Sequence, residues 1–143
     1  MLSYTNNYLI YQYIIDGLME SRIILETESR EISIELNGSD TAKKIIGSLP
    51  VRSNSNGWGD EIYFSIPVDA PLEDPLEILE VGDVAYWPPG KAFCIFFGKT
   101  PASSGNRPQA ASPVTLIGRI SDIKDIKILK ELKTGREVVL RLP

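Results

Sequence analysis

The chain has 143 residues, 43% of them hydrophobic, which suits one globular domain and leaves no room for a second. Its formal net charge of −4, with basic residues scattered along the chain, argues against a nucleic-acid surface, which needs clustered Lys and Arg. The sequence has no histidine, so His-based catalytic triads and His-ligated metal sites are excluded, and we expect no cofactor.

Residues 1–18 differ from the rest of the chain, because they are rich in Tyr and Ile and carry no basic residue. A signal peptide needs a positive n-region, and the apolar run at 8–15 is too short to cross a bilayer, so we expect no membrane insertion. We therefore divide the chain into an extension, residues 1–18, and a domain, residues 19–143. Two interpretations of the extension stay open: an upstream start codon before Met19, or an arm that docks or forms a homodimer.

The first regular patterns lie at residues 22–36, where apolar and polar residues alternate in two short runs and predict a half-buried β-hairpin. A helix should follow, capped by Ser39 or Asp40 and stopped by Pro50. Its apolar stripe, at helical spacing, consists of Ala42, Ile45, Ile46 and Leu49.

Another alternating strand is predicted at residues 58–67, followed by an acidic connection at 69–80. The strand's apolar face carries Ile62, Phe64 and Ile66, and its other face carries Glu61, Tyr63 and Ser65.

Residues 82–101 organise the predicted fold, since they contain two apolar runs, 84–87 and 92–97, joined by two prolines and a glycine. Proline cannot donate to a sheet ladder, so the first strand ends there. The second run is apolar at every position, so both of its faces should be covered. Alternation places Phe93, Ile95 and Phe97 on one face and Ala92, Cys94 and Phe96 on the other.

Cys94 is the only cysteine in the sequence, so no disulfide can form within the chain. Its apolar neighbours predict a buried and unreactive thiol. A chain without disulfides suits a reducing compartment, and we expect a cytoplasmic protein.

Residues 98–113 show no periodicity and are rich in Ser, Pro and Gly, which predicts a mobile loop over one end of the sheet. Strands at 114–120 and 137–142 complete the pattern, separated by a short helix at 122–132, and Gly118 permits close backbone packing. Many short strands with two helices predict a mainly β fold, a small closed or nearly closed antiparallel barrel.

Three ordered motifs carry a family resemblance: WGDEIYFSIPV at 58–68, GDVAYWPPGKAFCIFFGKTP at 82–101 and SPVTLIGRI at 112–120. They closely resemble the prokaryotic family of small, functionally uncharacterised cyclophilin-like proteins, and the resemblance runs from about Met19 to the C-terminus. It implies a closed cyclophilin-type β-barrel of about eight strands, capped by two short helices.

True cyclophilins are similar more distantly, and their prolyl isomerase site does not carry over. The strand that supplies their catalytic arginine corresponds to residues 61–67, which contain no arginine. Their active-site histidine corresponds to Val114, and the loop at 98–113 lacks their substrate-stacking tryptophan. Because the arginine stabilises the twisted amide, its absence argues against isomerase activity.

Aromatic side chains suit concave binding sites, and four of them are predicted to line a ligand pocket: Trp58, Tyr63, Tyr86 and Phe93. Core packing is the alternative interpretation of these residues. Glu61 joins the candidates, and its alternative, as part of the pair Asp60-Glu61, is a solvated or turn-stabilising carboxylate. Arg107, carried on the loop, is predicted to approach a ligand from above.

These observations favour a non-catalytic binding module for a small molecule or an extended peptide segment, with neither nucleic acid nor membrane as partner. A weak prolyl isomerase that uses backbone amides and a cation such as Arg52 or Arg107 is the alternative. An oligomeric scaffold built through residues 1–18 is a third interpretation.

Overall fold

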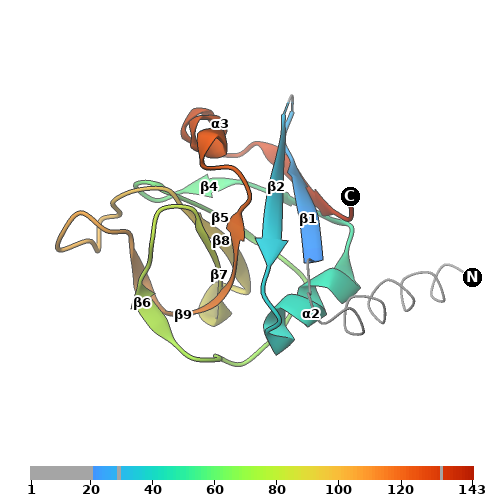
Figure 1. Cartoon of the computed structure of the whole chain (residues 1–143), viewed down its shortest axis with the longest axis horizontal. Helices are drawn as coiled ribbons and strands as arrows, with labels where there is room; N and C mark the ends of the chain where they lie inside the picture. Colours follow the sequence, from blue (N-terminus) through green and yellow to red (C-terminus); the bar gives the residue numbers. More distant parts are fainter. Residues whose placement is uncertain (1–20, 29, 133) are drawn as a thin grey trace, which may run out of the picture.

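The computed structural model describes residues 21–143 except 29 and 133, and in this part of the chain ten strands form an antiparallel sheet that curves around a core (Figure 1). Helix α2 lies below β1 and β2, and α3 lies at the upper side (Figure 1). None of the described helices is long and apolar enough to cross a membrane. The predicted extension, residues 1–18, and the dimerisation predicted for it lie outside the described residues.

The strands are arranged in the order β3-β10-β1-β2-β9-β7-β8-β5-β4, and β6 pairs with β9. Their bounds are β1 Ser21–Glu26, β2 Glu31–Leu36, β3 Val51–Asn54, β4 Asn56–Gly57, β5 Glu61–Ser65, β6 Leu76–Ile78, β7 Asp83–Trp87, β8 Ala92–Phe96, β9 Gln109–Ile120 and β10 Glu137–Arg141. The helices are α2 Asp40–Ser48 and α3 Ile126–Glu131. A mainly β fold with two short helices was predicted, and it is confirmed.

The predicted closure of the barrel is wrong, because the sheet is open and contains ten strands within the described residues. Its two ends, β3 and β4, are consecutive in the chain and are separated only by Ser55. The segment changes partner at this residue, since β3 pairs with β10 and β4 pairs with β5. A side-chain hydrogen bond, from the Ser53 hydroxyl to the Ser65 carbonyl at 2.8 Å, links β3 to β5 where a closed barrel would have a ladder.

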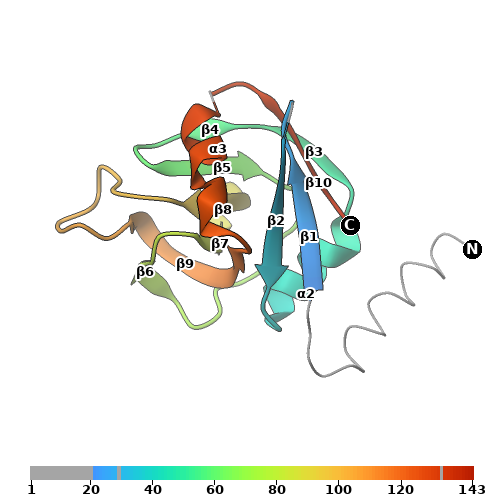
Figure 2. The ribbon, with the colours of Figure 1, turned by 45° about the horizontal axis from the view of Figure 1, so that its top comes forward.

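The early elements follow the sequence pattern closely. Strands β1 and β2 form the predicted hairpin, with Ile23 opposite Ile34, and both side chains are fully buried. Helix α2 begins after Ser39, whose hydroxyl accepts a hydrogen bond from the Ala42 amide at 3.1 Å. Figure 2 shows this helix beside the lower ends of β1 and β2.

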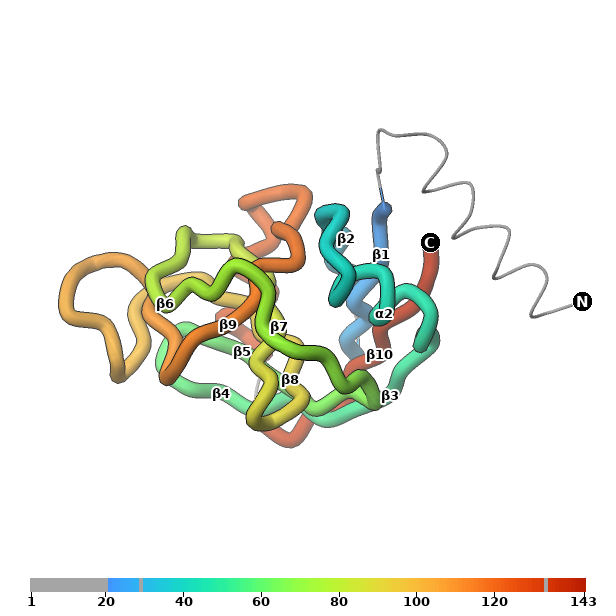
Figure 3. Tube along the Cα trace, turned by 90° about the horizontal axis from the view of Figure 1, so that it is seen from below, coloured from blue at the N-terminus to red at the C-terminus, as the bar shows by residue number. Residues whose placement is uncertain are grey.

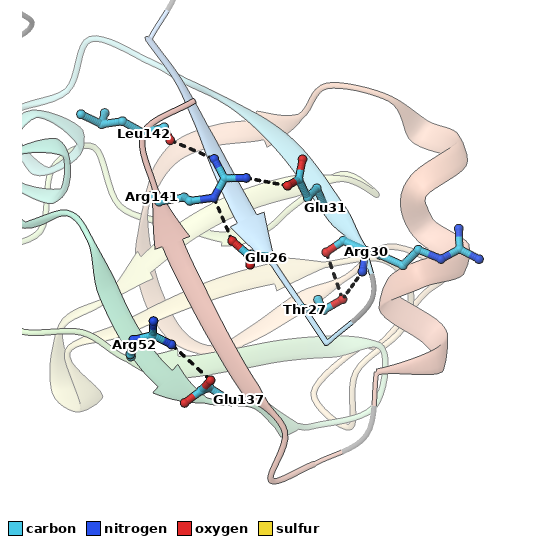
Figure 4. Close-up of polar contacts among 8 residues, drawn as sticks. All are labelled: Glu26, Thr27, Arg30, Glu31, Arg52, Glu137, Arg141 and Leu142. Atoms are coloured by element: carbon cyan, nitrogen blue, oxygen red, sulfur yellow. Dashed lines mark hydrogen bonds and ion pairs between the residues drawn. The ribbon is translucent and has the colours of Figure 1, made fainter.

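An arginine fixes the last strand to this hairpin (Figure 4). The Arg141 guanidinium on β10 donates to the carboxylates of Glu26, at 2.8 Å, and Glu31, at 2.5 Å. A further donor of the same guanidinium reaches the Leu142 carbonyl at 3.1 Å. The guanidinium therefore links β10 to both strands of the hairpin.

Strand β9 begins at Gln109, five positions before the predicted start at Val114, so the loop between β8 and β9 is shorter than predicted. It projects from one side of the molecule (Figure 3). Hydrogen bonds join it to itself and to β9: the Ser103 hydroxyl donates to the Arg107 carbonyl at 2.8 Å, and the Thr100 hydroxyl donates to the Gln109 carbonyl.

Strand β8 separates two apolar cores, as its unbroken apolar sequence predicted. The main core contains Phe93, Ile95 and Phe97 together with side chains from the β1–β2 hairpin, both helices and β10. The second core, called here the cavity-side core, consists of Leu79, Ala85, Ala92, Cys94, Phe96, Ala110 and Val114. Consecutive residues of β8 thus alternate between two separate environments.

Candidate functional site

A cavity of about 210 Å³ opens beside the cavity-side core. Its lining comes from the β4–β5 hairpin and from β7, β8 and β9, and consists of Trp58, Glu61, Tyr63, Trp87, Phe96, Ala110, Ala111 and Val114. Glu61 is the one acidic residue in this mostly apolar lining, which contains no basic residue. The lining strands belong to the sheet itself, so the cavity is formed by the fold rather than by a separate lid.

The β4–β5 hairpin brings Trp58 and Glu61 together. The Trp58 amide donates to the Glu61 carbonyl at 2.9 Å, across a two-residue turn that begins with Gly59 at φ +60°. A glycine with positive φ at this place is typical of the tight turns that match the twist of paired strands. Directly opposed residues of an antiparallel pair point to the same side, so the hairpin places both side chains against the cavity.

Small side chains explain why this side of the sheet is hollow. Ala85, Ala92, Cys94 and Ala110 lie in the cavity-side core, whereas the main core is filled by rings such as Phe64 and Phe93, which stack with centroids 5.2 Å apart. Protein interiors are normally close-packed, so short side chains on one face leave volume unfilled.

The Trp87 indole forms a fixed wall of the cavity. Its Nε1 donates to the Ser112 hydroxyl at 2.7 Å, which ties β7 to β9. Its ring also covers Gly90, where an added β-carbon would lie only 2.9 Å from the ring atoms. These contacts orient the ring before any ligand arrives, which lowers the cost of binding.

Glu61 has an unusual environment for a carboxyl group. The residue is only 6% exposed, and burial raises its pKa from 4.5 to about 7, while the nearby Cys94 thiol lowers the pKa in part. Among the described residues no Lys or Arg forms an ion pair with it. At neutral pH the carboxyl therefore lies close to the midpoint of its titration.

Cys94 is fully buried beneath the cavity, and burial raises the pKa of its thiol well above the usual value, with the nearby Glu61 carboxyl adding to the effect. A thiol needs a depressed pKa and access to solvent to act as a nucleophile. The buried, unreactive thiol predicted from the sequence fits this environment.

The structure brings together three of the six residues predicted for the site, since Trp58, Glu61 and Tyr63 all line the cavity. Tyr86 and Phe93 do not reach it, because both are fully buried in the main core on the opposite face of the sheet. Arg107 is exposed and pairs with Glu80, outside the lining.

Tyr86 serves the fold through its hydroxyl, which donates to the Val68 carbonyl in the interior. Tyr86→Phe is expected to lower the free energy of unfolding by about 1–2 kcal/mol, because the buried carbonyl loses its partner. Tyr63→Phe is the matched control, since the Tyr63 hydroxyl has no hydrogen-bond partner among the described residues and its loss should cost little. Urea unfolding of both variants tests this difference, and equal stabilities would contradict it.

Five lining residues escaped the prediction: Trp87, Phe96, Ala110, Ala111 and Val114. Alternation contained the signal for two of them. Tyr63 pairs with Cys94, so the face of β8 that carries Phe96 belongs to the same side as Tyr63. On β7, Trp87 points to this side, and Tyr86 points to the other. The alanines belong to the part of β9 that was predicted as a loop.

Comparison with known proteins identifies the family. The sequence model of the cyclophilin-like family matches residues 21–141. The solution structure of a hypothetical protein from Archaeoglobus fulgidus is similar to this chain with 40% identity and a TM-score of 0.72, over 87% of this chain and 95% of that one. A search of curated proteins found no significant match. The chain therefore belongs to the cyclophilin-like family.

Proposed function

We propose that this protein is a non-catalytic module that binds a small molecule in the cavity beside Trp58, Tyr63 and Trp87. The observation that carries the proposal is an apolar, aromatic-walled cavity with a single buried carboxyl group, which is the usual composition of a small-molecule site. The walls are held by strand pairing and by the Trp87–Ser112 hydrogen bond, so the site needs little rearrangement to bind.

The size of the cavity limits the ligand. A cavity of roughly 150 Å³ lined by apolar side chains binds benzene. The volume here, about 210 Å³, is somewhat larger and suits one ring or one branched group with a short polar tail. An extended peptide, the other partner predicted from the sequence, would place a single side chain of that size in the cavity.

The geometry gives prolyl isomerase activity no support. Arg52 pairs with Glu137 at 3.3 Å and Arg107 pairs with Glu80, and neither cation lines the cavity. Strand β5, which corresponds to the strand of the catalytic arginine in cyclophilins, presents Glu61 instead. A carboxyl group cannot stabilise the negative charge that an arginine would meet on a twisted amide.

A protease-coupled proline assay should therefore show no acceleration at micromolar protein. Uncatalysed X-Pro bonds isomerise in roughly tens to hundreds of seconds, so even weak catalysis is measurable. Acceleration that persists in Ala111→Phe, where the cavity is filled, would assign activity to another site, and acceleration lost in that variant would replace a binding role with a catalytic one.

Intrinsic fluorescence offers a direct test of binding. The sequence has two tryptophans, and both line the cavity, so a ligand that enters it should change the emission. Neutral probes of suitable size are benzyl alcohol and dimethylbutanol. Ala111→Phe should weaken their binding by about tenfold or more, since Ala111 is an exposed lining residue and a ring there fills the volume.

The melting temperature of Ala111→Phe should match that of the parent, and a free tryptophan analogue titrated in parallel corrects for collisional quenching. Saturable binding that Ala111→Phe abolishes supports the proposal. A flat titration with both neutral probes up to millimolar concentration, together with no ligand in the purified protein, would contradict it.

A further inference from the structure

We infer that the cavity selects small organic ammonium ions, which the Glu61 carboxylate would pair with while the rings of Trp58, Tyr63 and Trp87 surround the cationic group. The inference rests on the proposed function, because it names the ligand class of the same cavity.

The first observation is a buried acid that has no cationic partner in the part of the chain that the structure describes. Glu61 is 6% exposed, no Lys or Arg of the described residues forms an ion pair with it, and the nearby Cys94 thiol is neutral. Acidic side chains are almost never buried unless they are paired. The carboxyl lines an open cavity, so a cation brought by a ligand can occupy the place that a Lys or Arg side chain takes in other buried pairs.

The second observation is the set of rings around this carboxyl. Four aromatic residues line the same cavity: Trp58, Tyr63, Trp87 and Phe96. A ring attracts a cation to its face, most strongly when the ring belongs to Trp, and several rings together form a site for quaternary ammonium groups. Aromatic walls with one carboxylate therefore favour an ammonium head over a neutral or anionic one.

The pH dependence follows from the groups around Glu61. The titratable side chains that face it are Cys94 from β8 and Tyr63 from β5, while β7 and β9 contribute Trp87, Ala110, Ala111 and Val114, which do not ionise. The neighbouring Asp60 carboxyl lies against Gly98 instead. Because the pKa of Glu61 is raised to about 7, its carboxyl is mostly protonated at pH 6 and mostly ionised at pH 8.

Choline and dimethylbutanol form a matched pair of probes, since they share their shape and differ in the charge of one atom. At pH 8 the tryptophan fluorescence of the full chain should report choline binding about tenfold tighter than dimethylbutanol binding. Lowering the pH to 6 should weaken the binding of choline by about tenfold, because the ionised fraction of Glu61 falls, and should leave the affinity for dimethylbutanol unchanged. Choline carries a permanent charge, so this change reports the protein alone.

Glu61→Gln should remove the preference for choline and its pH dependence, so that the affinities of choline and dimethylbutanol become similar. Glu35→Gln, an exposed carboxylate on the outer face of β2, is the control and should behave as the parent. A trimethyllysine side chain carries the same head group, so its blocked amino acid is a third probe, and tighter binding than choline would overturn the assignment to a free small molecule.

The outcomes separate the two proposals. The ammonium inference would be overturned if dimethylbutanol and choline bound with equal affinity at pH 8, or if Glu61→Gln left the affinity for choline unchanged. The proposed binding module would stand in both cases. If neither probe binds, both fail together. If Glu61→Gln does not fold, the pH dependence of choline binding by the parent protein tests the ammonium inference, because an affinity that is equal at pH 6 and pH 8 would overturn it.

Discussion

Glu61→Gln is expected to raise the free energy of unfolding at pH 8 by about 3 kcal/mol, and to leave it nearly unchanged at pH 4. Burial raises the pKa of Glu61 from 4.5 to about 7 in the folded protein. Between these values the native state holds a proton that the unfolded state has released, so the stability of the parent falls as the pH rises through this window. Above the folded pKa the penalty stays constant. Glutamine has nearly the same shape as glutamate and cannot ionise, so the variant avoids the penalty of ionising a buried carboxyl group.

Urea unfolding at pH 4, 6 and 8, followed by tryptophan fluorescence, measures this effect. Glu35→Gln should keep the pH slope of the parent, since Glu35 is exposed. A parent protein whose stability does not fall between pH 5 and pH 8, or a Glu61→Gln variant with the parent's slope, would show that the carboxyl is better solvated than its burial indicates.

Gly118→Ala is expected to cost about 3 kcal/mol or more, through a backbone clash. Gly118 lies on β9 opposite Leu36 of β2. An added β-carbon would lie closer to the Glu35 carbonyl oxygen than real contacts allow, and 3.0 Å from the Leu36 Cα. Both atoms belong to the backbone, so relief requires β2 and β9 to separate, which breaks their pairing. The close packing predicted at this glycine is thus confirmed.

Gly47→Ala provides the contrast. Gly47 lies within α2, and an added β-carbon would meet nothing within 4 Å. Alanine loses less conformational freedom than glycine when a helix forms, so this variant should gain about 0.5–1 kcal/mol. Equilibrium unfolding of both variants checks the opposite signs. A loss below about 1 kcal/mol at Gly118 would mean that the strand pair can yield without cost.

The parts of the fold that followed from the sequence are those in which one face of an element is buried. Alternation in β5 placed Phe64 in the core and Tyr63 on the other side, and the unbroken apolar run of β8 indicated that both of its faces are covered. The order of apolar and polar residues along a strand predicts which of its side chains are buried, so these features could be predicted from the sequence.

Features that depend only on the backbone pairing of strands could not be predicted from the sequence. β6 is only three residues long, Leu76–Ile78, and all three are exposed, while β9 starts with Gln109, Ala110 and Ala111, so neither segment carries an apolar pattern long enough to be recognised as a strand. The change of partner at Ser55 depends on where two distant strands arrive. For the site, the sequence prediction chose Tyr86 and not its neighbour Trp87, because composition does not show which of two consecutive aromatic residues points toward the cavity. That depends on how β7 pairs with β8 and β9.

The alternation along β8 has a consequence for how this protein can change. Ala92, Cys94 and Phe96 belong to the cavity-side core, while their chain neighbours Phe93 and Ile95 belong to the main core. Phe96 lines the cavity, and Ala92 and Cys94 pack behind it, so substitutions in this set act on the side of the sheet that faces away from the main core. All three side chains are themselves buried, so the cavity-side core should tolerate only substitutions that keep its volume, and a library of size-matched apolar residues at the even-numbered positions of this strand would vary recognition while the odd-numbered positions maintain the scaffold.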